Sequence, residues 1–66
     1  MNASQNKDLV YLCIKMNSGL ASFPELVGTC RQQGVSPKET LQAVKIQEYR
    51  GKLSFIDGVV REVRHD

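Results

Sequence analysis

Gly51–Val63, with the sequence GKLSFIDGVVREV, is the segment around which we expect the rest of this chain to be built. Two short runs of β-forming residues, 52–56 and 59–63, flank Asp57-Gly58, a dipeptide that readily adopts the positive φ angles of a two-residue turn. The stretch therefore predicts a β-hairpin over residues 52–63. An isolated hairpin is only marginally stable in water, so the residues before it must supply a surface on which it lies.

The register of this hairpin follows if Asp57-Gly58 is the whole loop, because cross-strand partners share one face of the pair. Leu53, Phe55 and Val60 then lie on one face, which we expect to pack on the helices. The opposite face carries Lys52, Ser54, Arg61 and Val63, with Ile56 and Val59 at its tip. The apolar tip is a candidate contact for a second copy of the chain or for another protein.

The first helix is predicted over residues 6–17, after a disordered lead of residues 1–5. Asn6 is its expected N-cap, with Asp8 in the first turn. Its apolar face is expected to contain Leu9, Leu12, Cys13 and Met16, widened by Val10 and Ile14. A strand is the alternative for Leu9–Ile14, because this run is unbroken, apolar and contains Val, Tyr and Ile.

Two further helices are predicted from their N-terminal signals. Ser22, with Glu25 three residues later, begins a helix over 23–33, and Ser36 with Glu39 begins another over 37–50. Only Gly34-Val35 separates the second helix from Ser36, a tight glycine-containing turn of the kind that a helix-turn-helix requires. Residues 1–66 are therefore predicted to form one α+β domain, with three helices followed by a C-terminal two-stranded β-hairpin.

Length and composition limit the classes of function. A chain of 66 residues buries only about 60% of the surface that its unfolded form exposes, which favours association with a partner. No apolar run could cross a membrane and the N-terminus lacks a secretory pattern, so we expect a cytoplasmic protein with no membrane partner. In that reducing compartment Cys13 and Cys30 are expected to be free thiols on buried faces. The net charge of +2 neither requires nor excludes an anionic partner.

Four segments between Glu25 and Val63 carry a resemblance to a known family. They read ELVGTC, then GVSPKETLQAV, then EYRGKLSF, then the DG turn with VVREV. The order of these segments resembles the winged helix-turn-helix family of DNA-binding domains. In that family a short helix, a glycine-containing turn and a helix opening with serine are followed by a glycine and a two-stranded wing. The positions that agree best are Gly34, Ser36, Ala43, Val44, Gly51 and Leu53.

Three features depart from the family pattern. Gln47 is polar where the family commonly has an apolar residue. The short first strand of the family is expected only around Leu20-Ala21, where the sequence signal is weak. Asp57 lies at the tip of the wing, where Lys or Arg would suit a phosphate backbone better.

The resemblance implies that the third helix enters the major groove of double-stranded DNA while the wing contacts the backbone or minor groove nearby. Helical residues are about 100° apart, so Lys38, Gln42, Lys45 and Tyr49 fall into one stripe. Gln binds adenine in a bidentate manner, and Lys reaches guanine or phosphate. We expect Gln42 and Lys45 to read bases. Phosphates are expected at Lys38, Tyr49, Lys52 and Arg61 and at the amides near Ser36. The expected function is a small transcriptional or accessory regulator.

Two other classes of function are weighed against DNA binding. A polar stripe is also typical of a helix face that is simply solvated. Winged helices also serve as protein-binding modules, so a function as an adaptor or inhibitor protein is the alternative to DNA binding. An enzyme is not expected, because no nucleophile–base spacing is present and the single histidine, His65, is next to the C-terminus. Cys13, Cys30 and His65 are too few for a structural zinc site, so no metal, cofactor or small-molecule substrate is expected.

Overall fold

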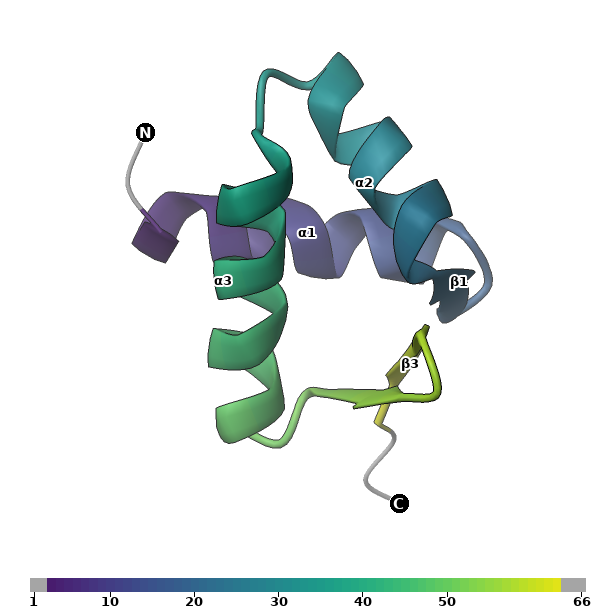
Figure 1. Ribbon diagram of the computed structural model, residues 1–66. Helices are drawn as coiled ribbons and strands as arrows, with labels where there is room; N and C mark the ends of the chain where they lie inside the picture. Colours follow the sequence, from purple (N-terminus) through teal and green to yellow (C-terminus); the bar gives the residue numbers. More distant parts are fainter. Residues whose placement is uncertain (1–2, 64–66) are drawn as a thin grey trace.

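The computed structural model describes residues 3–63 of the chain, and the side chains of residues 6–63. Three helices and three strands follow one another along this stretch, so the predicted α+β class is confirmed. The elements are α1 (Ala3–Met16), β1 (Leu20–Ser22), α2 (Phe23–Gln32), α3 (Pro37–Tyr49), β2 (Leu53–Ile56) and β3 (Val59–Glu62). Figure 1 shows α1 running behind α2 and α3, with the strands at one end of α3 and below α2.

The hairpin of β2 and β3 has the predicted turn and register. Asp57 and Gly58 both have positive φ angles, 54° and 75°, as a two-residue turn of this type requires. Phe55 is paired with Val60 and Leu53 with Glu62. Leu53 and Val60 are buried and Phe55 is half-buried, so the predicted inward face of the hairpin is confirmed.

A third strand makes the sheet larger than the predicted hairpin. β1 pairs antiparallel with β3, with Leu20 opposite Arg61 and Ser22 opposite Val59, so the strand order is β1-β3-β2. The prediction of a two-stranded sheet was incomplete, whereas the short strand expected around Leu20-Ala21 is present. Three residues are too few to show the alternation by which a strand is recognised in a sequence.

The first helix differs at its start from the prediction. The segment Leu9–Ile14 is helical and not a strand, but α1 begins at Ala3. Residues 3–5 of the expected disordered lead are therefore helical, and residues 1–2 lie outside the described part of the chain. Asn6 is not an N-cap: it lies inside the helix, fully buried, and its Nδ2 donates a 2.9 Å hydrogen bond to Glu39 Oε2 in α3.

The buried face of α1 also differs from the expected one. Val10 and Ile14 are fully buried, whereas Leu12 and Met16 are 52% and 79% exposed. The helix packs on the rest of the domain through a stripe that includes the polar residue Asn6, and a count of apolar residues cannot detect such a stripe. Leu9 and Cys13 of the predicted face are partly buried against the core, so that only Leu12 and Met16 lie outside the contact.

The predicted ends of α2 and α3 are nearly correct, but only one of the two capping boxes is present. At α3, Ser36 Oγ accepts a hydrogen bond from the Glu39 N–H and the Glu39 carboxylate accepts one from the Ser36 N–H. At α2, the Ser22 side chain makes no capping hydrogen bond. Ser22 is the last residue of β1 and lies opposite Val59 of β3.

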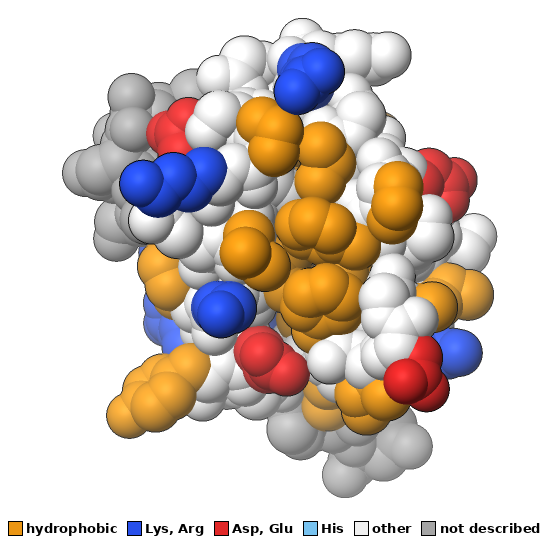
Figure 2. All heavy atoms as spheres, viewed as in Figure 1, with side chains coloured by type: hydrophobic (Ala, Val, Ile, Leu, Met, Phe, Trp, Pro, Cys, Tyr) orange, Lys and Arg blue, Asp and Glu red, His pale blue; other side chains and the backbone are white. Residues whose placement is uncertain are grey.

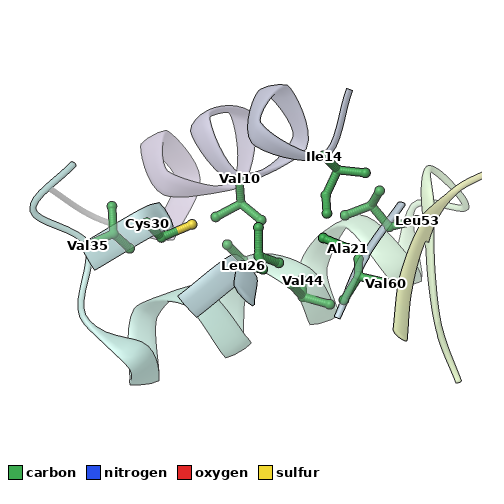
Figure 3. Packing of buried hydrophobic residues seen from close by; sticks show 10 residues of the cluster. Val10, Ile14, Ala21, Leu26, Cys30, Val35, Val44, Leu53 and Val60 are labelled. Atoms are coloured by element: carbon green, nitrogen blue, oxygen red, sulfur yellow. The ribbon is translucent and has the colours of Figure 1, made fainter. Parts of the chain in front are cut away.

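The hydrophobic core takes residues from each helix and strand. Figure 3 shows Val10 and Ile14 of α1 pointing toward Leu26 of α2 and Leu53 of β2. Gln47 of α3 is 1% exposed although it is polar. Within residues 3–63 no helix has both the length and the apolar character needed to span a bilayer. The core consists of Val10, Ile14, Ala21, Leu26, Cys30, Val35, Ala43, Val44, Leu53 and Val60.

Candidate nucleic-acid interface

One polar stripe on α3 gathers four of the seven predicted DNA-contacting residues. The helix buries Thr40, Ala43, Val44 and Gln47. Because these buried residues share one side of the helix, the residues about 180° away from them face solvent. Tyr49 at the C-terminal end of the stripe is 93% exposed. The α3 stripe consists of Lys38, Gln42, Lys45 and Tyr49, all of which are exposed.

Contacts on the opposite flank of α3 hold this helix against α1. Gln47 Nε2 donates a 2.9 Å hydrogen bond to the Lys7 carbonyl oxygen, and Asn6 donates to Glu39 near the start of α3. The capping box at Ser36 satisfies the N–H groups of Ser36 and Glu39 at the start of the helix. The four side chains of the α3 stripe are thus carried by an element that is fixed at both ends.

The charges of the α3 stripe are not neutralised by contact with a described carboxylate. Across residues 6–63 the ion pairs are Lys7–Asp8 and Lys15–Glu62, both away from Lys38 and Lys45. The nearest acid to Lys38 in sequence is Glu39, whose carboxylate oxygens accept hydrogen bonds from Asn6 and from the Ser36 N–H. Hydrogen bonding by Ser36, through its side chain and then its backbone, and by Asn6 lowers the pKa of Glu39.

Ser36 is occupied by its capping role. Its N–H donates to Glu39 Oε1 and its Oγ accepts from the Glu39 N–H, each at 3.2 Å. Pro37 has no N–H to offer. A phosphate that bound the Ser36 N–H would have to displace the Glu39 carboxylate. The expected phosphate contact at Ser36 therefore competes with the capping box.

Lys52 and Arg61 follow α3 in the chain and belong to the hairpin region. Lys52 Nζ is 5.7 Å from the centroid of the Tyr11 ring in α1, a cation–π distance, and Lys15 Nζ is equally far from the same ring. Arg61 is exposed and is paired with Leu20 and Ser54 in the sheet. Since its neighbour Val60 points into the core, Arg61 belongs to the outer face of the sheet.

An aromatic pair joins the hairpin to α2, and it was not predicted from the sequence. The rings of Phe23 and Phe55 stack with centroids 5.2 Å apart and an interplanar angle of 24°. Both side chains are half-buried. Figure 2 shows hydrophobic side chains gathered on the face between α2 and α3, with charged side chains around them. The register had placed Phe55 inward, but nothing local to the sequence indicates its partner.

Comparison with protein-family models, with curated protein sequences and with solved structures found no match to this chain.

The two cysteines were the thiols considered as metal ligands. Cys30 is buried, as expected, and burial raises the pKa of its thiol to about 11, while Cys13 is half-buried. Within residues 3–63 no three His, Cys, Asp or Glu side chains are grouped as a metal ion would require. His65 lies outside the described residues.

Proposed function

We propose that this chain is a small DNA-binding protein of the winged helix-turn-helix type, with α3 as its recognition helix. The observation that supports this most is the α3 stripe: two lysines without ion-pair partners among the described residues, an exposed Gln and an almost fully exposed Tyr, on the side of a fixed helix that faces away from the core. These side chains suit base edges and phosphates.

The dimensions of α3 agree with this role. An α-helix with its side chains is about 10–12 Å wide, which matches a major groove about 12 Å wide. Lys38 and Tyr49 are eleven positions apart, so the α3 stripe extends over about 16 Å of helix, which is about five base pairs. In this arrangement Gln42 and Lys45 are central and read bases, and Lys38 and Tyr49 at the two ends contact phosphates.

The hairpin would act as the wing through its flank and not through its tip. Asp57 is exposed at the turn, where its negative charge repels a phosphate. Arg61 on the outer face of the sheet and Lys52 beside Tyr11 are the cations that the hairpin region offers. Replacing Asp57 by Asn removes the repulsion, keeps a residue that tolerates positive φ, and should strengthen binding.

Binding to mixed-sequence duplex DNA, measured over a range of salt concentrations, tests the proposal. Each neutralised phosphate contributes about −0.9 to the slope of log K against log salt. The double variant Lys38→Ala/Lys45→Ala should flatten the slope by nearly two such contacts. The matched control is Arg31→Ala, which removes an exposed cation from α2 and should leave the slope unchanged. Absence of binding by the natural chain at low salt would refute DNA binding.

The second candidate function is a protein-interaction module that binds through the tip of the hairpin. It is favoured by Ile56, which is 66% exposed next to the half-buried Val59. An amide-shift titration with duplex DNA separates the two functions. Shifts confined to residues 36–49 and the hairpin support DNA binding, whereas an unchanged spectrum at low salt rules DNA binding out.

A further inference from the structure

The two cysteines of the chain lie on helices that pack against each other, Cys13 on α1 and Cys30 on α2. Cys30 is fully buried in the hydrophobic core, and Cys13 is half-buried and packs against that core. Figure 3 shows Cys30 with its sulfur atom on the side of Val10 of α1. Val10 and Cys13 are three positions apart, so they are neighbours on the surface of one helix. Cys30 therefore points toward the part of α1 that carries Cys13.

A groove between α1 and α2 places Cys13 opposite the turn of α2 that contains Cys30. The groove has a volume of about 350 Å³, and Cys13 is one of its lining residues. On the α2 side it is lined by Leu26, Thr29 and Gln33. These residues flank position 30 on the helix surface, at four positions before it, one before it and three after it. A small molecule in solvent thus reaches Cys13 through the groove, whereas Cys30 lies within the core.

The ionisation of Cys30 responds to Cys13. The pKa of the Cys30 thiol is raised to about 11, chiefly by burial and in part by the charge and hydrogen bonding of Cys13, against the lowering effect of hydrogen bonding with Thr40. Hydrogen bonding acts only over a short distance, so the two thiols are near neighbours. A disulfide requires sulfur atoms about 2 Å apart. Rotation of the half-buried Cys13 side chain, which has the groove beside it, supplies this movement.

We propose that Cys13 and Cys30 are a redox-active pair, which a small disulfide such as oxidised glutathione converts into a reversible disulfide bond between α1 and α2. In the structure both residues are free thiols, the reduced form of the pair. This modification site shares no residue with the α3 stripe and does not depend on DNA binding.

The bond forms by two successive exchanges of thiol and disulfide. The Cys13 thiolate attacks one sulfur of oxidised glutathione, which gives a mixed disulfide and releases one glutathione thiolate. The Cys30 thiolate then attacks the Cys13 sulfur and releases the second glutathione thiolate, and the two released thiolates take up the protons that the cysteines have lost. Two electrons thus pass from the protein to glutathione. Cys13 reacts first because the groove gives access to it, whereas buried Cys30 forms little thiolate.

The bond fixes the helix on which α3 rests. Asn6 and the Lys7 carbonyl group of α1 both form hydrogen bonds with α3, so a covalent link from α1 to α2 joins all three helices. The bond also closes a loop over residues 13–30, which restricts the unfolded chain more than the folded one. Oxidation should therefore raise the Tm, by about 10 °C or more.

Equilibration of the reduced full chain with mixtures of reduced and oxidised glutathione, followed by acid quenching and mass spectrometry, tests the pair. We expect a monomer that has lost two hydrogens and, after digestion, a cross-linked peptide that contains both cysteines. The equilibrium constant for the bond should be at least about ten times larger in buffer than in urea that unfolds the chain, because folding favours the bond by the same factor by which the bond stabilises the fold. An equal or smaller constant in buffer would show that the fold keeps the thiols apart and would overturn the proposal, as would a natural chain that yields only glutathione adducts.

Two substitutions test the order of the exchanges. In Cys30→Ala, Cys13 should acquire one glutathione that stays attached, because no second thiol releases it. In Cys13→Ala, Cys30 should stay unmodified while the chain is folded, and the amide spectrum verifies the fold of each variant. Equal rates of adduct formation in the two folded variants would mean that glutathione reaches the cysteines only through unfolding, and the proposal would fail. The equilibrium in the natural chain is measured without either variant, so it decides the matter even if one of them does not fold.

Discussion

The Tyr11 hydroxyl of α1 donates a 2.9 Å hydrogen bond to Glu62 Oε2 at the end of β3, across 51 positions of the chain. The same carboxylate oxygen is 4.0 Å from Lys15 Nζ, and the ring of Tyr11 lies close to the ammonium groups of Lys15 and Lys52. A single aromatic side chain therefore connects the first helix to the central strand of the sheet.

Replacing Tyr11 by Phe should lower the Tm by a few degrees at neutral pH, because Glu62 loses its donor while the ring and its cation contacts stay. The hydrogen bond to Glu62 raises the pKa of Tyr11 above its ordinary value of 10.0. The stability that depends on the neutral phenol is complete below pH 10 and is lost as pH rises through the raised pKa. The Tm difference between the two proteins should therefore shrink in alkaline buffer. Melting curves that stay equally far apart would contradict this account.

Two glutamines of α3 should respond differently to replacement by Met. Gln47 is 1% exposed, and its Oε1 is buried without a hydrogen-bond partner in the described part of the chain. Gln47→Met keeps the volume and removes the unsatisfied oxygen, so the free energy of unfolding should be unchanged or rise by up to about 1 kcal/mol, although the bond to Lys7 is lost. Gln42→Met, on the α3 stripe, should leave stability unchanged and weaken DNA binding. Urea unfolding measures the stability of the two variants, and duplex titration measures DNA binding by Gln42→Met. A fall of more than about 2 kcal/mol in the free energy of unfolding of Gln47→Met would show that the bond to Lys7 dominates.

Two glycines should respond in opposite directions to replacement by Ala. Gly28 lies inside α2, and a Cβ there would meet nothing within 4 Å, so Gly28→Ala should raise the free energy of unfolding by about 0.5–1 kcal/mol. Gly58 has φ 75° in the turn, a conformation that costs Ala about 1 kcal/mol or more. Chemical denaturation of the two variants measures both effects. Equal destabilisation by the two substitutions would mean that Gly28 is required for a contact outside the described structure.

The loss of stability at acidic pH should depend in part on Glu39. Its pKa is lowered from the ordinary value of 4.5 in the folded chain, so its contribution is present above that pH and is lost as pH falls through the lowered pKa. In Glu39→Gln this part of the acid dependence should disappear. Glu48→Gln, an exposed substitution in the same helix, is the control and should keep it. Thermal melts between neutral and acidic pH give the comparison, and identical profiles for the two variants would count against the role of the capping box.

The sequence predicted best those features that local chemistry determines. The turn at Asp57-Gly58 sets the register of the hairpin, and the capping box at Ser36 sets the start of α3, without reference to the rest of the chain. The α3 stripe could also be placed, since it follows from the helical period. The buried face of α1 could not, because Asn6 is buried through a bond to Glu39, which is 33 positions away.

Side-chain contacts between residues distant in the chain could not be predicted from the sequence pattern. The cation–π contact of Lys52 with Tyr11 and the stack of Phe23 on Phe55 each join elements whose packing no local motif specifies. The helical period places Gln47 on the same side of α3 as Ala43 and Val44, away from Gln42, but the sequence could not show that the Gln47 amide bonds to the Lys7 carbonyl of α1.

The strand order β1-β3-β2 has a consequence for synthesis on the ribosome. The central strand is the last of the three to be translated, and β1 and β2 each pair with it. While the chain grows from its N-terminus, all three helices and two strands emerge before the strand that joins the sheet together. The nascent chain can thus assemble helices early, but its sheet closes only after translation has passed Glu62.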